Sequence, residues 1–494
     1  MKVHLYTIVA VATLLCAIAP CIAQTPALGD LDRLQLQLDE QANTIRELTD
    51  RLNSQDERFG RAPATDSKSC TPDSVLRLPL VCQEPIDAGC DDSGSDARVR
   101  KLDYYADYNK GFAIRPFDPS KNPFSLKTNF WVQFRHHAFA REDESWTDNA
   151  GVTRPVRSRN AFDLERARLV FSGFAIDPRL TYFLQLDGDT DGSHAVDFFD
   201  FWWGWKFSDR FRVQVGRRKV TGSRQWLLTA RRTRFTERPM ANDFFRPDRT
   251  VGIFGFGSFG DTGKYQLTFG NTHRTNTPES RSDNRLMFAA TSFFDPLGAY
   301  GNSIVDEEVT DQTRVRLGHS VVYSQQRGRR LGVPFDEANF VRLSDGTRLT
   351  QIGALSPGVT VSEFDLYSYG VDAAIKWNGW SMNAEYFARW IEQIEGDGPV
   401  PTTDLFQHGH YVEGGYFLVP KRFDVNGRYS QVGGEFGTRS EYAIGCNWYP
   451  LAKQAIKLSF DVTTLDGSPL QNTASNILAG DDGTLYRSQF QAEF

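Results

Sequence analysis

From about residue 111 to its end, the chain alternates apolar and polar residues with a period of two, which predicts β-strands. In 199–207, for example, Phe and Trp residues alternate with Asp, Gly and Lys. The same alternation recurs in 165–174, 180–187, 211–218, 264–269, 423–428 and 456–462. The apolar side of these strands is rich in aromatic residues, as expected of a surface that meets lipid and its interfaces. The polar side should then face water.

Turns and spacing favour one large closed sheet over several soluble domains. About 16 strand candidates fit into 111–494, with about 24 residues for each strand and its connection. The short turns 176–179 and 207–210 alternate with long polar connections such as 295–313 and 325–363. Short turns at one rim and long loops at the other are typical of an outer-membrane barrel. We therefore expect an all-β protein, a transmembrane antiparallel β-barrel over 105–494 that leaves an aqueous channel.

The last ten residues, LYRSQFQAEF, predict the strand that closes this barrel. Tyr486, Phe490, Ala492 and Phe494 share one of its faces. A closing strand with a terminal aromatic residue is the type of signal that the outer-membrane assembly machinery recognises. We expect Phe494 to act as that signal.

The beginning of the chain follows other patterns. Residues 1–23 combine Lys2 with an apolar stretch and a final Cys-Ile-Ala, which indicates a cleavable signal peptide and export. Residues 24–58 predict a periplasmic coiled-coil helix, because a heptad pattern with one polar position runs through Leu31, Leu34, Leu38, Gln41, Ile45, Leu48 and Leu52. So short a helix is marginal in isolation, so we expect it to self-associate. The alternative is a helix that lies on its own domain.

Residues 59–104 form a linker that is rich in Cys, Pro and Asp and has no periodicity. Export would allow Cys70, Cys82 and Cys90 to form disulfides, but their pairing stays open. Because no CxxC pair or adjacent His accompanies them, we expect no metal site there. Cys446 lies on the apolar face of a predicted strand.

Composition and hydropathy argue against a membrane-spanning helix after the leader, but they are compatible with a β-barrel. The chain has 494 residues, with 56 Lys and Arg against 62 Asp and Glu, and a mean hydropathy of −0.45. After the leader, no apolar run reaches the ~18 residues that a membrane helix needs. A barrel strand needs no such run, because half of its residues face a polar interior.

One basic stretch, 217–249, interrupts the strands. It holds nine Arg and Lys219 against only Glu237, Asp243 and Asp248, in a chain that is slightly acidic. Rings of Arg and Lys favour anions in a pore, and a guanidinium offers phosphate a planar fork of donors. We expect an anion pathway formed by Arg166, Arg168, Arg212, Arg217, Arg218, Lys219, Arg224, Arg231, Arg232, Arg234 and Arg238. The alternatives are a solvated surface loop or, for single residues, salt bridges to acids such as Glu165, Asp187 or Glu237.

Enzymatic chemistry finds little support in the sequence. His136 and His137, and likewise His408 and His410, lack an arranged carboxylate or Cys partner, and no Ser–His spacing suggests a triad. The run 255–257, Gly-Phe-Gly, lies in a predicted strand rather than before a helix, so it is not a nucleotide-binding fingerprint. We expect no catalytic residues, no cofactor and no nucleic-acid partner.

Three segments resemble the phosphate-selective porin O and P family. They are 162–189, FDLERARLVFSGFAIDPRLTYFLQLDGD; 213–257, which begins VQVGRRKVTGSRQWLLTARR and includes Glu-Arg-Pro; and the end, EYAIGCNWYPLAKQAIKLSFDV through YRSQFQAEF. The resemblance covers about 105–494. It implies a homotrimer of 16-stranded barrels in outer-membrane lipid, each with a long third loop folded into the pore and basic side chains along an anion path. Lys219 matches the family's Gly-x-x-Lys and is the first candidate for the constriction. This chain departs from the family in its many lumenal acids and in a basic stretch that Arg dominates.

Three hypotheses follow for the function. The first is an outer-membrane porin for small anions, such as phosphate. The second is a structural protein that tethers the envelope through its coiled coil, with a non-selective pore. The third is a soluble secreted all-β binding protein, which extraction without detergent would distinguish from the other two.

Overall fold

In the computed structural model, the described residues are 103–188, 196–272, 285–327 and 341–494. They all belong to one compact unit, Ala97–Phe494. The predicted signal peptide, the coiled-coil segment 24–58 and the three clustered cysteines lie outside the described residues. The same holds for the linker up to residue 102.

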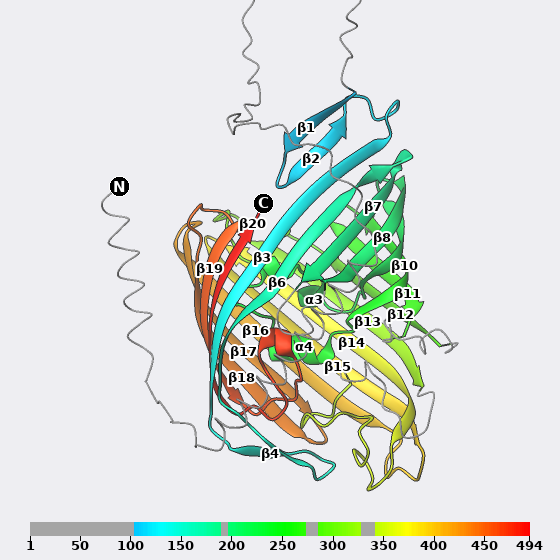
Figure 1. The fold of residues 1–494 in the computed structure, drawn as a ribbon, viewed down its shortest axis with the longest axis vertical. Coiled ribbons are helices and arrows are strands. Elements are labelled where there is room, and N and C mark those ends of the chain that lie inside the picture. The colour runs from blue at the N-terminus through cyan, green and yellow to red at the C-terminus, as the bar shows by residue number, and fades with distance from the viewer. Residues whose placement is uncertain (1–102, 189–195, 273–284, 328–340) are drawn as a thin grey trace, which may run out of the picture. The chain divides into compact units, whose positions relative to one another are not determined.

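One antiparallel sheet closes on itself and forms a barrel (Figure 1). Each strand pairs with the strands before and after it, and β20 returns to pair with β3, from Glu493 opposite Trp131 to Gly483 opposite Arg141. The described residues thus confirm the predicted all-β barrel of about 16 strands. The strands are β3 (Phe124–Arg141), β6 (Arg159–Ala175), β7 (Asp177–Gly188), β8 (Val196–Ser208), β9 (Phe211–Lys219), β10 (Arg249–Phe259), β11 (Gly263–Asn271), β12 (Leu286–Phe294), β13 (Arg314–Arg327), β14 (Val361–Trp377), β15 (Trp380–Gly396), β16 (Leu405–Val419), β17 (Phe423–Gly434), β18 (Gly437–Trp448), β19 (Ile456–Asp466) and β20 (Gly483–Glu493).

Smaller elements flank or fill this barrel. A hairpin of β1 (Tyr104–Tyr108) and β2 (Phe112–Pro116) pairs with the first residues of β3. A second hairpin, β4 (Ser145–Thr147) with β5 (Thr153–Pro155), lies between β3 and β6. The long connection between β9 and β10 contains the short helices α3 (Arg224–Leu227) and α4 (Met240–Phe245). Among the described residues, no helix is both long and apolar enough to cross a membrane.

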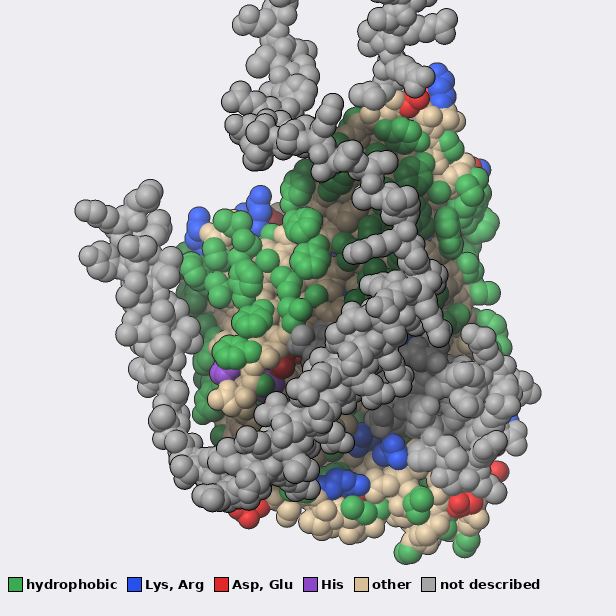
Figure 2. Space-filling model, viewed as in Figure 1, with side chains coloured by type: hydrophobic (Ala, Val, Ile, Leu, Met, Phe, Trp, Pro, Cys, Tyr) green, Lys and Arg blue, Asp and Glu red, His purple; other side chains and the backbone are tan. Residues whose placement is uncertain are grey.

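The barrel wall separates apolar from polar side chains as the period of two predicts. Trp203, Phe269 and Ile444 point away from the barrel and are 47%, 51% and 69% exposed. On the opposite face, Arg135 and Asp461 are fully buried within the barrel. Hydrophobic side chains cover much of the outer wall, and charged ones gather toward its ends (Figure 2). This outward apolar surface suits lipid, and the polar lining suits an aqueous interior.

Tight turns join the strands at the rim where β20 ends. Asn378 and Gly379 have φ of 49° and 82° between β14 and β15, as a two-residue hairpin turn requires. From its length, we expected 295–313 to be one of the long loops at the other rim. This expectation was wrong: the segment connects the end of β12 to the start of β13, at the short-turn rim. Length alone suggested the wrong rim, because loop length does not reveal strand direction.

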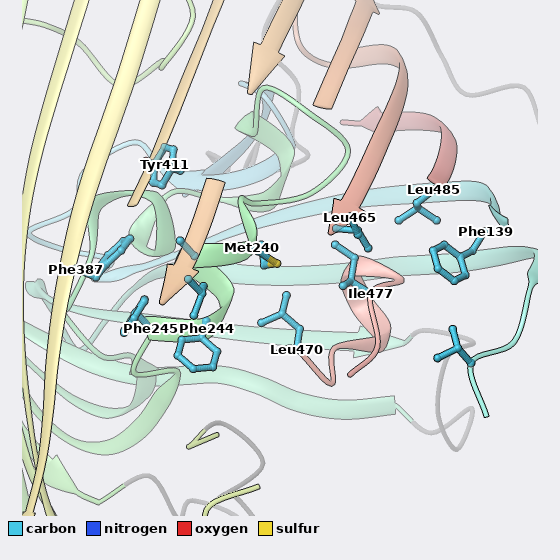
Figure 3. Packing of buried hydrophobic residues seen from close by; sticks show 13 residues of the cluster. Phe139, Met240, Phe244, Phe245, Phe387, Tyr411, Leu465, Leu470, Ile477 and Leu485 are labelled. Carbon is cyan, nitrogen blue, oxygen red and sulfur yellow. The ribbon is translucent and has the colours of Figure 1, made fainter. Parts of the chain in front are cut away.

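Part of the interior is an apolar core rather than open space. Met240, Phe244 and Phe245 of α4 pack against inward-facing wall residues and against the connection between β19 and β20 (Figure 3). Phe245 stacks on Phe387 of β15, with ring centroids 5.4 Å apart. Leu470 belongs to the same cluster. The β9–β10 connection is therefore held by hydrophobic burial as well as by polar contacts.

Candidate functional site inside the barrel

Segment 220–248 connects β9 to β10 and contacts side chains on the inner face of the wall. Glu385 of β15 accepts a hydrogen bond from the backbone N–H of Gln225 at 2.7 Å. Glu441 of β18 accepts one from the backbone N–H of Met240 at 2.6 Å. The first N–H groups of a short helix lack partners within the helix, so carboxylates of the wall can bind them strongly. Each of the two helices in this segment is fixed to the wall in this way.

A buried carboxylate of the segment also binds wall arginines. The Glu237 carboxylate accepts a hydrogen bond from Arg135 of β3 at 2.7 Å and another from Arg166 of β6. Burial by itself would raise the pKa of the Glu237 carboxyl, but the neighbouring Arg166 and Arg135 hold this pKa well below its usual value. Glu237 therefore stays ionised and neutralises part of the charge of these two guanidinium groups.

Other arginines of the wall are paired with carboxylates in the same manner. Arg428 of β17 donates to Glu413 at 3.0 Å and to Glu441 at 3.1 Å. Arg487 of β20 donates to Asp461 of β19 at 2.8 Å. All of these side chains are buried. Because each guanidinium has its own carboxylate, these residues add little net positive charge to the interior.

Lys219 and Arg238 differ, because carbonyl groups bind them. The Lys219 ammonium donates to the backbone oxygens of Trp226 (2.7 Å) and Leu228 (2.9 Å) and lies 4.5 Å from the centre of the Trp226 ring. Arg238 donates to the backbone oxygens of Gln225 (3.2 Å) and Leu228 (2.8 Å). A carbonyl or an indole stabilises a cation without cancelling its charge. The first candidate for the constriction thus lies in direct contact with segment 220–248.

Two predicted arginines of β9 lie on aromatic rings of the inner wall. Arg212 lies 4.9 Å from the Phe256 ring, and Arg218 lies 4.3 Å from the same ring. Arg218 also donates to the side-chain amide of Gln214. Arg217 shares the outward face of Val251, opposite which it lies in β10, and donates to the backbone oxygen of Phe198 at 3.0 Å. Arg217 is therefore separated from the other candidates.

Three candidates in segment 220–248 differ in whether a carboxylate binds them. Arg224 forms an ion pair with Asp372 of β14 at 2.7 Å, and Arg231 pairs with Glu493 of β20. Arg232, in the helical turn Ala230–Arg232, is partly exposed. In the described part of the chain, its guanidinium makes no hydrogen bond and no ion pair. Among the candidates in segment 220–248, Arg232 is thus the one whose charge is most available to a solute.

The last two candidates are held firmly by the structure around them. Arg168 of β6 donates to Asp187 at 2.7 Å and lies 4.2 Å from the Phe199 ring. Arg234 donates to the hydroxyl of Ser381 at 2.9 Å and to the backbone oxygen of Ile304 at 3.2 Å. Both side chains are buried.

Sequence reasoning missed Arg135, which forms ion pairs with both Glu165 and Glu237. A signal was present, because Gln133 and Arg135 alternate with the apolar Val132 and Phe134 in β3.

A second connection enters the interior from the short-turn rim. In 295–313, Tyr300 and Ile304 are only 4% and 3% exposed. The Asp306 carboxylate accepts a hydrogen bond from the Gly379 backbone N–H at 2.7 Å. Since Arg234 binds the Ile304 carbonyl, this connection and segment 220–248 contact each other inside the barrel.

A closed barrel with a polar, charged interior is the architecture of a porin, and sequence comparison decides the family. The profile of the phosphate-selective porin O and P family matches residues 143–494. The chain belongs to this family. It therefore forms a channel of the outer membrane, and its fold is that of a channel rather than an enzyme. No curated protein matches the chain in sequence.

Several solved porins are similar in fold. OmpT, an outer membrane protein of Vibrio cholerae in its trimer form, has a TM-score of 0.47 and 10% identity over 75% of this chain and 99% of its own. An anion-selective porin from Comamonas acidovorans has a TM-score of 0.48 and 11% identity, with the same shares covered. Salmonella typhi OmpF in complex with daunomycin has a TM-score of 0.47 and 14% identity over 79% of this chain and 100% of its own.

Proposed function

We propose that this channel passes small anions, phosphate among them, by passive diffusion, and that segment 220–248 forms its constriction as an inward-folded third loop. The carrying observation is the partly exposed Arg232, which has no carboxylate partner among the described residues. Lys219 and Arg238 support the proposal, because carbonyl groups bind them and leave their charge uncancelled. A low-dielectric wall strengthens the field of such charges in a narrow passage.

The ion pairs along the wall have a different role in this proposal. Arg135, Arg166 and Arg428 are matched by buried carboxylates, so they fix the position of the loop. The selectivity then depends on the few cations that lack such a partner. This division explains how a chain with more acidic than basic residues can favour anions.

The proposal extends to assembly and orientation. The chain would form a homotrimer in outer-membrane lipid, with the short-turn rim and the N-terminal segment on the periplasmic side. The assembly machinery would recognise the end of β20. A homotrimer would migrate as a larger species in unheated detergent gels than after boiling, whereas a monomer would show no such species.

The deciding experiment measures the reversal potential of the purified channel in a planar bilayer under a KCl gradient. We expect a potential of the sign that anion preference gives. Arg232→Glu should reduce the ratio of anion to cation permeability by about threefold or more, because it replaces an unpaired cation by an anion.

The matched control is Arg210→Glu, which makes the same charge reversal in the exposed turn between β8 and β9. This variant should keep the permeability ratio of the wild type. Cation preference of the wild type would overturn the proposal, and equal ratios for Arg232→Glu and the wild type would remove Arg232 from the pathway.

A further inference from the structure

The inner face of β7–β10 carries a row of aromatic side chains. Phe183 of β7 and Trp202 of β8 are paired residues whose rings stack, with centroids 5.4 Å apart and planes 3° apart. Phe254 and Phe256 of β10 continue the row across β9. Phe183 and Trp202 are partly exposed. The inward-facing Phe387 is buried against Phe245 of the β9–β10 connection, whereas no hydrophobic cluster of the described residues covers Phe183 and Trp202.

Two guanidinium groups lie on this aromatic row. Arg218 lies 5.9 Å from the Trp202 ring and 5.4 Å from the Phe254 ring, and Arg212 lies over Phe256. Arg212 is exposed. Within the described residues, neither guanidinium has a carboxylate partner; Arg218 is bound by the neutral amide of Gln214. Their charge is therefore available, unlike that of Arg135 or Arg428.

We propose that Phe183, Trp202, Arg212 and Arg218 form a binding track for planar organic anions, in particular aromatic carboxylates. Phe254 and Phe256 are buried and support the two guanidinium groups from behind. The proposal deepens the proposed function and rests on it, because the solute must first be an anion that enters the channel. The carboxylate would bind the guanidinium groups, and the ring of the solute would lie against Trp202 and Phe183.

The chemistry of the row distinguishes this class from small inorganic anions. A guanidinium binds phosphate and carboxylate alike, but only a solute with a flat apolar surface gains from aromatic side chains. Stacked rings contribute beyond the area that they bury, and a cation placed on a ring can bind an anion with its free edge. A row built only for phosphate would have no use for Trp202.

The test is block of the KCl current through the intact channel by benzoate, compared with cyclohexanecarboxylate and acetate. Cyclohexanecarboxylate has the same charge and a similar size but no flat ring. We expect benzoate to block at a concentration about threefold to tenfold lower than cyclohexanecarboxylate. Acetate should need the highest concentration of the three. Trp202→Leu should abolish this difference, and Arg218→Gln should weaken block by both of the larger anions.

Trp203→Leu is the matched control, since Trp203 is the next residue of β8 and points outward. Benzoate should block Trp203→Leu at a lower concentration than cyclohexanecarboxylate does, as in the wild type. KCl conductance of each variant shows that the barrel has formed. An anion-selective wild type on which benzoate and cyclohexanecarboxylate act equally would overturn the track alone. A cation-selective wild type would overturn the proposed function and the track with it.

Discussion

At the residue scale, the partner of each basic side chain decides what it does. Arg135 and Arg166 share the buried carboxylate of Glu237. Lys219 instead donates to the carbonyl oxygens of Trp226 and Leu228, and it forms no ion pair within the part of the chain that the structure describes. Strand periodicity predicted correctly that Arg166 and Arg218 point inward. It could not predict the partner of Arg135, because Glu237 is 102 positions away in the chain and lies in a segment without periodicity.

Acid should weaken the attachment of segment 220–248. Because the pKa of the Glu237 carboxyl is lowered in the folded protein, its stabilisation is complete above about pH 5. It is lost as the pH falls below the usual glutamate value of about 4.3 toward the lowered pKa. Glu237→Gln should cost about 1–3 kcal/mol at pH 7, since two buried guanidinium groups lose one carboxylate partner while Glu165 still pairs with both.

The measurement is the thermal unfolding temperature of the channel in detergent between pH 7 and pH 3. The wild type should lose more stability over this range than Glu237→Gln, which lacks the titrating group. Parallel curves for the two proteins would show that Glu237 does not couple the segment to the wall.

At the element scale, two connections share the interior. Segment 220–248 enters from one rim and 295–313 from the other, and Arg234 joins them through the Ile304 carbonyl. The basic composition of the first made it recognisable in the sequence. The second gave no such signal, because its buried residues Tyr300, Ile304 and Val305 are few and follow no period.

Replacing 299–308 by a short Gly-Ser linker should increase the single-channel conductance, because it removes buried side chains from the interior near segment 220–248. The control is the same replacement in 398–403, an exposed connection between β15 and β16. Conductance should rise in the first variant and stay near the wild-type value in the second. An unchanged conductance in both would show that 295–313 does not limit the passage.

At the scale of the whole molecule, the barrel depends on the pairing of β20 with β3. The Phe494 backbone extends this seam, since its N–H donates to the Phe130 oxygen at 3.0 Å and its oxygen accepts from the Phe130 N–H at 3.3 Å. Alternation, turns and spacing in the sequence predicted this closing strand and a barrel of about 16 strands. It did not predict the β1–β2 hairpin, whose strands are too short to show a reliable period.

Phe494→Ser should lower the yield of folded barrel severalfold, because it removes the ring that packs on Phe130 at 5.8 Å and the terminal aromatic residue that we expect the assembly machinery to recognise. Heat-dependent gel mobility of membrane extracts measures this yield. Phe124→Ser, at an exposed ring of β3, is the control and should keep the wild-type yield. Equal yields for both variants would contradict the role of Phe494.

The β3–β20 seam has a further consequence for how the protein is made. Gln133 and Gln491, which hydrogen-bond across it at 2.8 Å, are 358 positions apart in the chain. β3 can therefore complete its pairing only after β20 has been made, and pairing across so long a separation is intrinsically slow. Until then, both edge strands of the unclosed sheet present unpaired N–H and C=O groups, which can pair with other chains and cause aggregation. We therefore expect the protein to need a chaperone that prevents premature strand pairing until β20 is available.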